Sequence, residues 1–379
     1  MIPKSGNRFS DKIMREKDVS EQPTRSIPVS VITGFLGSGK TTLLSRLLAD
    51  ARMTKAAVII NEFGEVGLDH VLVTSPREDV VLLASGCLCC SLRGDLVNTL
   101  ASLYGERARG EIPPFDRVLV ETTGLADPAP VLLTVTADEQ LAQLFHVERV
   151  IATVDAVHGL GQLDSQPESV KQACVADVIL LTKTDIAAAV TLAALRARLQ
   201  RLNPIALCRD VVQGEIDPDW LFNFAAPGMA RTREFHGLVE QVECDHAHAH
   251  DRHDHGPHAG ISSFAVIRDQ PVTFAGLELW MDMLGEVRGP SLLRIKGIVN
   301  VGGRPIVIQG VQHMFHPLSE LPDWPDEDRR SRIVFITKDV AREQIERTLD
   351  ALSLDIAPRA QGIDAEAFRQ FVAAASKFR

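Results

Sequence analysis

The sequence predicts an α/β protein in which a doubly wound, mostly parallel sheet is followed by a smaller α+β domain. Short runs of Val, Ile and Leu alternate with helical stretches through the first half of the chain, as buried parallel strands do. A glycine-rich loop leads from the first run straight into a helix. Further strand-like runs surround one amphipathic stretch in the last third. The six early runs are 29–33, 56–61, 80–84, 118–120, 150–154 and 178–182.

The 379 residues divide into four predicted segments. Residues 1–26 mix charges with Ser and Pro and predict a disordered tail. Residues 27–225 hold the alternating runs, and residues 226–260 form a polar linker. Residues 261–379 form the small domain, which is expected to end in an amphipathic helix. Its expected elements are strands near 263–267, 292–299, 305–308 and 332–336, and helices at 274–284 and 364–378.

Composition excludes several classes of function. The formal net charge is −10, so a nucleic-acid partner is not expected, because phosphate backbones require a basic surface. No uninterrupted run of about 18 apolar residues occurs, so no membrane association is expected. No apolar segment follows the N-terminal charges, so no export signal is expected. Three of the six cysteines fall within four residues, unlike a disulfide framework, which favours a cytoplasmic location.

The first run ends in Gly34-Phe-Leu-Gly37-Ser38-Gly39-Lys40-Thr41-Thr42, which has the spacing and context of a P-loop. Its glycines let backbone N–H groups turn toward the α- and β-phosphates, and the helix adds the positive end of its dipole. Lys40 is expected to reach the β- and γ-phosphates, and the Thr41 hydroxyl to bind Mg²⁺. The sequence therefore predicts a nucleoside triphosphate site that includes Ser38 and Thr42.

Two further segments predict the parts that respond to the γ-phosphate. Residues 61–70 carry two glycines and three carboxylates after the second run, as a mobile nucleotide switch does. Glu121 ends the fourth run and Gly124 follows closely, which is the Walker B arrangement. We expect Glu121 to bind Mg²⁺ and the Gly124 amide to sense the γ-phosphate. These patterns do not identify the residue that activates the attacking water, for which Glu65, Glu121 and a residue supplied by a partner are the candidates.

Recognition of the base is predicted for Thr182-Lys183-Thr184-Asp185, which follows the sixth run. The Asp185 carboxylate can accept from both N1–H and N2–H₂ of guanine, a pattern that adenine does not offer. The Lys183 stem is expected to cover the face of the base. In the usual Asn-Lys-x-Asp version the Asn supports the loop. Thr182 replaces it here, so the sequence leaves open how strongly GTP is preferred.

A soft-metal site is predicted after the third run, where Gly86-Cys87-Leu88-Cys89-Cys90 stands. Three thiolates at this spacing can converge on one Zn²⁺ or Cu(I) ion. A tetrahedral ion then keeps one position for another ligand, so the site suits metal transfer unless Glu62 or a distant residue completes the shell. A redox pair and buried apolar cysteines are the alternatives.

Six of the twelve histidines fall within residues 246–258, interleaved with Asp. Neutral imidazoles bind borderline cations, and protonation at about pH 6 releases them. We expect a weak accessory metal-collecting segment, with an inert solvated linker as the alternative. The six residues are His246, His248, His250, His253, His255 and His258.

With a P-loop, an acidic switch, Cys-x-Cys-Cys, Glu-x-x-Gly and Thr-Lys-x-Asp in this order, the sequence resembles the CobW-like P-loop GTPases. That family is related to the urease and hydrogenase nickel-insertion GTPases. The resemblance is strong over residues 27–225 and weaker beyond them. It implies a GTP- and Mg²⁺-dependent hydrolase with a CobW-like C-terminal domain. It also implies binding of Zn²⁺, or in some branches Co²⁺, and delivery to a client metalloprotein.

Several alternatives stay open from the sequence. The client is a zinc enzyme, a cobalt-handling system of cobalamin synthesis, or a nitrile hydratase-like metalloenzyme. A metal buffer with a regulatory nucleotide site is a rival from another class. So is a P-loop kinase or synthase, against which Thr-Lys-Thr-Asp argues. The oligomeric state is not fixed, and a homodimer is one option.

Overall fold

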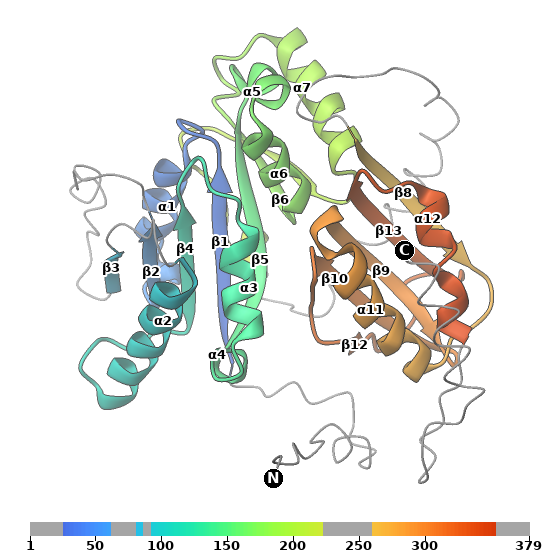
Figure 1. Cartoon of the computed structure of the whole chain (residues 1–379). Helices are drawn as coiled ribbons and strands as arrows, with labels where there is room; N and C mark the ends of the chain where they lie inside the picture. The colour runs from blue at the N-terminus through green and yellow to red at the C-terminus, as the bar shows by residue number, and fades with distance from the viewer. Residues whose placement is uncertain (1–25, 62–80, 86–91, 223–259, 354–379) are drawn as a thin grey trace, which may run out of the picture.

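The computed structural model describes residues 26–61, 81–85, 92–222 and 260–353 (Figure 1). These residues form two sheets with their helices. The predicted N-terminal tail, the acidic switch after Asn61, the cysteine motif, the histidine-rich linker and the end helix all lie outside the described residues. The predictions that can be compared with the structure are therefore those for the P-loop, Glu121, Gly124 and the 182–185 segment.

The first sheet has seven strands in the order β3-β2-β4-β1-β5-β6-β7, and every strand pair in it is parallel. Its central strands are almost entirely buried, as expected for a sheet covered by helices on both faces. This confirms the predicted doubly wound α/β class. The strands are β1 (Ile27–Gly34), β2 (Ala56–Asn61), β3 (Val81–Ser85), β4 (Arg117–Thr122), β5 (Phe145–Asp155), β6 (Val178–Thr182) and β7 (Leu207–Val211).

Strand β7 was not predicted from the sequence. Its sequence is Leu-Cys-Arg-Asp-Val, and the three central side chains are exposed. The strand pairs with β6 and forms the end of the sheet order, so it buries little side-chain surface. With three exposed residues at its centre, β7 lacks the continuous aliphatic run that identifies the other six strands.

Helices cover both faces of this sheet. Helix α1 packs Leu43 and Leu47 against Ile32 and Val58 on one face, and α8 joins the same core. The other long helices pack on the opposite face, where Val31 and Val120 contribute to the core. The helices are α1 (Lys40–Ala49), α2 (Leu92–Arg109), α3 (Ala129–Ala137), α4 (Leu141–Leu144), α5 (Gly159–Ser165), α6 (Pro167–Val175), α7 (Ala189–Leu202) and α8 (Pro218–Phe222), with the short 3₁₀ turn η2 (Ala51–Met53) after α1.

The second sheet has six strands and only antiparallel pairs among them. Helix α11 covers one face, and its fully buried Trp280 meets Phe335 edge to face. Thr273 caps this helix by accepting from the Gly276 N–H. The predicted α+β character is confirmed. The elements are β8 (Ile261–Arg268), α11 (Phe274–Arg288), η5 (Gly289–Ser291), β9 (Leu292–Val301), β10 (Arg304–Val311), β11 (Met314–Phe315), β12 (Ser319–Glu320), β13 (Ser331–Lys338), α12 (Arg342–Glu346) and η6 (Leu349–Ser353).

The opposite face of the second sheet packs on the first domain. One continuous core joins Leu293 and Ile298 of β9 to Val170 and Cys174 of α6. Strand β9 is buried along its whole length for this reason. Figure 1 shows α6 between the large sheet and the antiparallel sheet.

Strand register brings the carboxyl ends of the parallel strands to one edge. Gly34 is in register with Thr153, and Asp155 with Thr182. Farther along the sheet, Asn61 is in register with both Thr122 and Ser85. Ligands of doubly wound sheets bind at this edge, and the predicted motifs follow these strand ends.

Candidate nucleotide and metal site

The P-loop has the backbone conformation that a phosphate cradle requires. Gly34, Gly37 and Gly39 have φ angles of 141°, 72° and 93°, which L side chains rarely adopt. A Cβ at Gly34 would also lie 2.4 Å from the Thr153 carbonyl oxygen, so only glycine fits there. Gly39 is the N-cap of α1, which aims the helix N-terminus at the loop. This geometry provides backbone donors and a positive dipole end for an anion.

Lys40 lies folded against this loop. Its side chain is mostly buried, and Nζ donates to the carbonyl oxygens of Gly34 at 3.0 Å and Phe35 at 3.3 Å. The ammonium is therefore placed inside the curve of the loop, where the β- and γ-phosphates are expected. Nearby, the Ser38 and Thr153 hydroxyls are hydrogen-bonded at 2.6 Å, which ties the loop to the end of β5.

Thr41 and Glu121 meet, although 80 residues separate them. The Thr41 hydroxyl donates to Glu121 Oε1 at 2.7 Å, and the Glu121 side chain is only 5% exposed. A hydroxyl and a carboxylate at the N-terminus of α1 are hard oxygen ligands of the kind that Mg²⁺ prefers. These two residues fit the predicted magnesium site, where the ion would neutralise charge on the β- and γ-phosphates.

Gly124 lies directly on the P-loop. A Cβ at this position would be 2.6 Å from the Leu36 N and 2.8 Å from the Leu36 Cα. The segment from Thr122 to Pro128 is thus the neighbour of the phosphate cradle, as the Walker B interpretation requires. Leu36 and Leu125 expose about half of their side-chain surface at this edge.

Thr182 takes the loop-supporting position of the missing Asn. Its hydroxyl donates to the Ser38 carbonyl oxygen at 2.7 Å, and the Val154 carbonyl oxygen lies 3.3 Å away. A threonine can therefore join the base-recognition segment to the P-loop. Three positions farther along, Asp185 is exposed at the same sheet edge.

Asp155 is a site residue that the sequence analysis missed. It is 1% exposed at the end of β5, and it accepts from the N–H groups of Val157 and His158. Lys183 Nζ donates to Asp155 Oδ2 at 2.5 Å and to the Gly37 carbonyl oxygen at 2.8 Å. Burial opposes ionisation of Asp155, but the Lys183 ammonium and the two amides outweigh it and hold its pKa below the usual value. Asp155 thereby fixes Lys183, whose φ of 57° already marks a constrained turn.

A loop after β7 also reaches the P-loop helix. Gln213 and Gly214 have φ angles of 50° and 76°, and a Cβ on Gly214 would lie 2.8 Å from the Thr42 carbonyl oxygen. Arg46 of α1 donates to the Gln213 carbonyl oxygen at 3.2 Å. The Gln-Gly pair was the available sequence signal for this turn.

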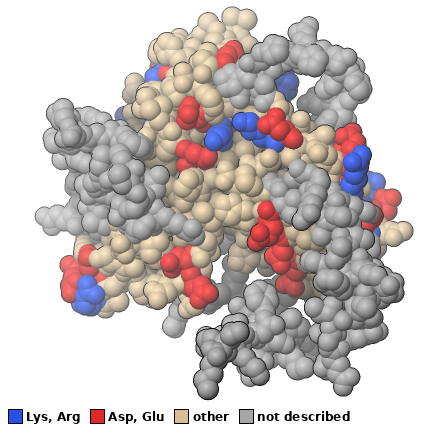
Figure 2. Space-filling model, viewed as in Figure 1, with Lys and Arg blue, Asp and Glu red and all other residues tan. Residues whose placement is uncertain are grey.

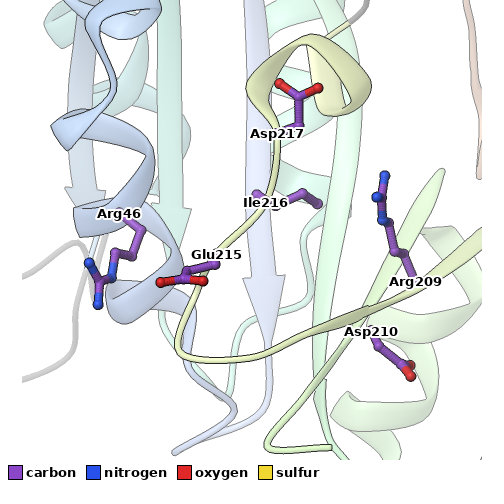
Figure 3. A pocket seen from close by; sticks show the side chains of 6 residues that line it. All are labelled: Arg46, Arg209, Asp210, Glu215, Ile216 and Asp217. Atoms are coloured by element: carbon purple, nitrogen blue, oxygen red, sulfur yellow. The ribbon is translucent and has the colours of Figure 1, made fainter.

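Beside this loop lies an open groove of mixed charge (Figure 3). Its basic residues have structural contacts. Arg209 stacks over the Trp220 ring at 4.6 Å, and Arg46 binds the loop backbone. The groove is lined by Arg46, Arg209, Asp210, Glu215, Ile216 and Asp217. We assign it to the support of the loop and not to a second ligand.

Charges of both signs are mixed on the described surface. On the face in Figure 2, the described Lys and Arg side chains lie among Asp and Glu and form no extended basic patch. Among the described helices, none combines the length and apolar character needed to cross a bilayer.

The predicted metal ligands other than Thr41 and Glu121 lie outside the described residues, as does Glu65. This applies to Cys87, Cys89 and Cys90 and to the six histidines between His246 and His258. Within the part of the chain that is described, no group of three His, Cys, Asp or Glu side chains is arranged to hold a metal ion. Cys174 is buried in α6, and burial raises its pKa to about 12, so it remains a thiol.

The fold and this edge define a P-loop nucleotide-binding protein, and comparison with known proteins gives the family. Residues 28–209 match the CobW/HypB/UreG nucleotide-binding domain, and residues 261–353 match the cobalamin synthesis protein cobW C-terminal domain. The chain is 37% identical to the zinc chaperone YjiA of Escherichia coli over 324 residues, covering 84% of this chain and 96% of YjiA. The chain therefore belongs to the CobW family of P-loop GTPases.

Other relatives agree with this assignment. The zinc-regulated GTPase metalloprotein activator 1 of Schizosaccharomyces pombe is 26% identical, with 88% of this chain and 87% of the relative covered. The crystal structure of Zn(II)-bound YjiA GTPase superposes with a TM-score of 0.63 at 32% identity, covering 86% of this chain and 99% of YjiA. A Zn(II)-bound YjiA triple mutant, with one glutamate and two cysteines changed to alanine, gives a TM-score of 0.64 at 32% identity over 87% of this chain and 100% of the mutant.

Proposed function

We propose that the chain is a GTP-hydrolysing metallochaperone that binds Zn²⁺ through Cys87, Cys89 and Cys90 and delivers it to a client metalloprotein under control of the nucleotide state. The observation that carries the proposal is the convergence of Lys40, Thr41, Glu121 and the 182–185 segment on one sheet edge. The zinc chaperones among its relatives support the cargo.

The position of Ser85 supports a link between metal and nucleotide. Strand β3 ends at Ser85, in register with Asn61, which is in turn in register with Thr122. Cys87 follows two residues later, which is at most about 7 Å of extended chain. Strand β3, which leads into the cysteine motif, therefore ends at the nucleotide edge, with two strands between it and the P-loop strand. A change at the γ-phosphate and a change in metal affinity are then energetically linked in both directions.

The roles within the GTPase site follow from the contacts. Lys40 is placed to exchange its carbonyl partners for phosphate oxygens, and Thr41 with Glu121 would hold Mg²⁺. Because Glu121 is engaged with Thr41, we assign the positioning of the attacking water to Glu65. Asp185 would select guanine while Asp155 and Thr182 hold its segment against the P-loop.

GTP turnover under anaerobic conditions tests this function. It would be measured with and without one equivalent of Zn²⁺ or Co²⁺, in the wild type and in a Cys87→Ser, Cys89→Ser, Cys90→Ser variant. We expect metal-dependent turnover that disappears in the variant, with the more effective ion indicating the cargo. Turnover that is independent of metal in both proteins would instead leave a GTPase without the metal coupling that a metallochaperone requires.

The zinc-bound YjiA triple mutant calls for a second control. That protein was crystallised with Zn(II) although a glutamate and two cysteines had been replaced. Zinc bound outside the cysteine motif would obscure the result, and the histidine-rich segment is the main candidate here. A variant with all six histidines from His246 to His258 changed to Asn should keep the metal-dependent turnover and lose only weakly bound metal.

A further inference from the structure

Helix α6 contacts the γ-phosphate-sensing segment at one side and the C-terminal domain at the other. Gln172 of α6 is 1% exposed, and its Nε2 donates to the carbonyl oxygens of Gly124 at 3.1 Å and Ala126 at 3.0 Å. The preceding residue, Lys171, binds Asp127 Oδ2 at 3.2 Å. Two consecutive residues of one helix thus hold the loop that follows Glu121.

The Gln172 amide has only one orientation that satisfies these contacts. Both partners are carbonyl oxygens, so the NH₂ group must face them, and an inverted amide would place oxygen against oxygen. Gln172 Oε1 is buried and accepts no hydrogen bond from the described residues. A buried acceptor in this state is unfavourable, and an apolar side chain of the same length would avoid it. Packing alone does not account for glutamine at this position.

The contact is placed to respond to the nucleotide. Gly124 lies against the P-loop residue Leu36, and its carbonyl oxygen accepts from the Gln172 amide. Within the loop, the Leu125 N–H donates to the Thr123 hydroxyl and the Ala126 N–H to the Thr123 carbonyl oxygen, so residues 123–126 form one compact turn. A shift of this turn toward a γ-phosphate therefore changes both Gln172 bonds together.

The other side of α6 is firmly joined to β9. Val170, Ala173 and Cys174 share a core with Leu293 and Ile298. Just after the helix, Asp177 pairs with Arg294, and Lys296 lies 3.9 Å from the same carboxylate oxygen.

Asp177 is also held by the first domain. Its second carboxylate oxygen accepts from the Val150 N–H at 3.0 Å. Burial opposes its ionisation, but Arg294, Lys296, this N–H and Arg149 together hold the pKa of Asp177 below its usual value. The residue that follows α6 by two positions is therefore tied to both β5 and β9.

We propose that Gln172 is a positioning residue of the γ-phosphate-sensing loop and that α6 transmits the position of this loop to the C-terminal domain. The inference rests on the GTPase cycle proposed above. It gives the C-terminal domain a means to distinguish the GTP from the GDP state without contacting the nucleotide. The chemistry of the contact is specific: an amide donor on α6 and two loop carbonyls as acceptors.

The test compares Gln172→Met with Gln166→Met in the full-length chain. Methionine keeps the length of the side chain and removes the donor. Gln166 precedes the same helix, and its amide has only a 3.4 Å contact with Ser165. GDP affinity, GTP turnover, and hydrogen exchange of β9 peptides with GDP or a non-hydrolysable GTP analogue would be measured for each protein. If Gln172→Met does not fold, Gln172→Asn retains the amide but is too short to reach both carbonyls.

For Gln172→Met we expect GDP affinity within about twofold of the wild type and kcat reduced roughly fivefold to thirtyfold at similar KM, because two neutral hydrogen bonds are lost. The nucleotide-dependent difference in β9 exchange should disappear, while Gln166→Met keeps it. An unchanged β9 difference and unchanged kcat in Gln172→Met would overturn the inference and leave the GTPase function intact. A wild type that neither binds nor hydrolyses GTP would instead refute the proposed function.

Discussion

The parallel sheet and the antiparallel sheet place their polar side chains differently. In the parallel sheet, polar pairs such as Thr41–Glu121 and Lys183–Asp155 gather at the carboxyl edge. In the antiparallel sheet, the buried cations Arg294 and Lys296 lie in the middle of β9 and face the first domain. Parallel strands end together, so their loops converge into one site, whereas antiparallel strands end alternately at both edges.

This difference suggests a division of roles between the two domains. The carboxyl edge of the first sheet carries every candidate nucleotide residue that the structure describes. The second sheet is instead held by a shared core and a buried ion cluster. We therefore expect the C-terminal domain to act through its contact with the first domain. Changes to its buried charges should lower the free energy of unfolding more than they lower the rate of GTP hydrolysis.

The largest expected effect is the loss of stability in Arg294→Met. Removing one partner of a buried ion pair leaves the Asp177 carboxylate undercompensated, which typically costs about 3–5 kcal/mol. Urea unfolding would measure this loss. Arg304→Met is the matched control, because Arg304 pairs with Glu320 on the exposed side of the same domain and should cost at most about 1 kcal/mol. Equal small losses in both variants would contradict the role of the cluster.

A smaller effect, on specificity, is expected for Asp185→Asn. An amide at this position can no longer accept from both guanine donors, so preference should move from guanosine to xanthosine nucleotides. By analogy with other bidentate base contacts, the change should be about 1–3 kcal/mol, or roughly tenfold to a hundredfold. Competition binding of GTP and XTP measures it. Asp210→Asn on strand β7 serves as the control. Unchanged GTP selectivity in Asp185→Asn would show that Asp185 does not recognise the base.

The smallest effect concerns the exposed face of α11. Glu278, Asp282 and Glu286 stand four residues apart, and like charges at this spacing destabilise a helix. Partial burial and the next carboxylate along the helix raise the pKa values of Glu278 and Asp282. We expect Asp282→Lys to stabilise the protein by about 0.5–1 kcal/mol at pH 7.

The sign of the pH dependence follows from these raised pKa values. Ionisation of Glu278 and Asp282 is harder in the folded state, so their charge opposes folding. This penalty is absent below the unfolded pKa of about 4 and grows as pH rises through the folded values. The gain from Asp282→Lys should therefore be present at neutral pH and vanish at about pH 3. Thermal unfolding at both pH values measures it, and a gain independent of pH would exclude charge repulsion as the cause.

The sequence predicted those parts of the site that are encoded by neighbouring residues. The P-loop, Glu121 with Gly124, and the 182–185 segment are each contiguous, and each follows an aliphatic strand, so residue type and position agree. The fold class followed from the same alternation of strands and helices.

The missed features depend on contacts between distant parts of the chain. Asp155 ends its strand as many acidic residues do, and only the fold places Lys183 against it. Gln172 is one polar residue in an ordinary helix, and its role appears only when Gly124 lies beside it. Strand β7 was missed because its three central residues are exposed and it therefore lacks an aliphatic run. Such residues have no local pattern from which their partners could be inferred.

Control of the metal site by the nucleotide can be measured as the Zn²⁺ affinity of the wild type, determined anaerobically by competition titration with GDP and with a non-hydrolysable GTP analogue. For a nucleotide-controlled metallochaperone we expect at least a fivefold difference in affinity between the two nucleotide states, within the usual range of coupling between sites. The difference should be absent in Lys40→Ala, which cannot hold the phosphates. Equal Zn²⁺ affinity in both nucleotide states of the wild type would contradict a nucleotide-controlled metallochaperone.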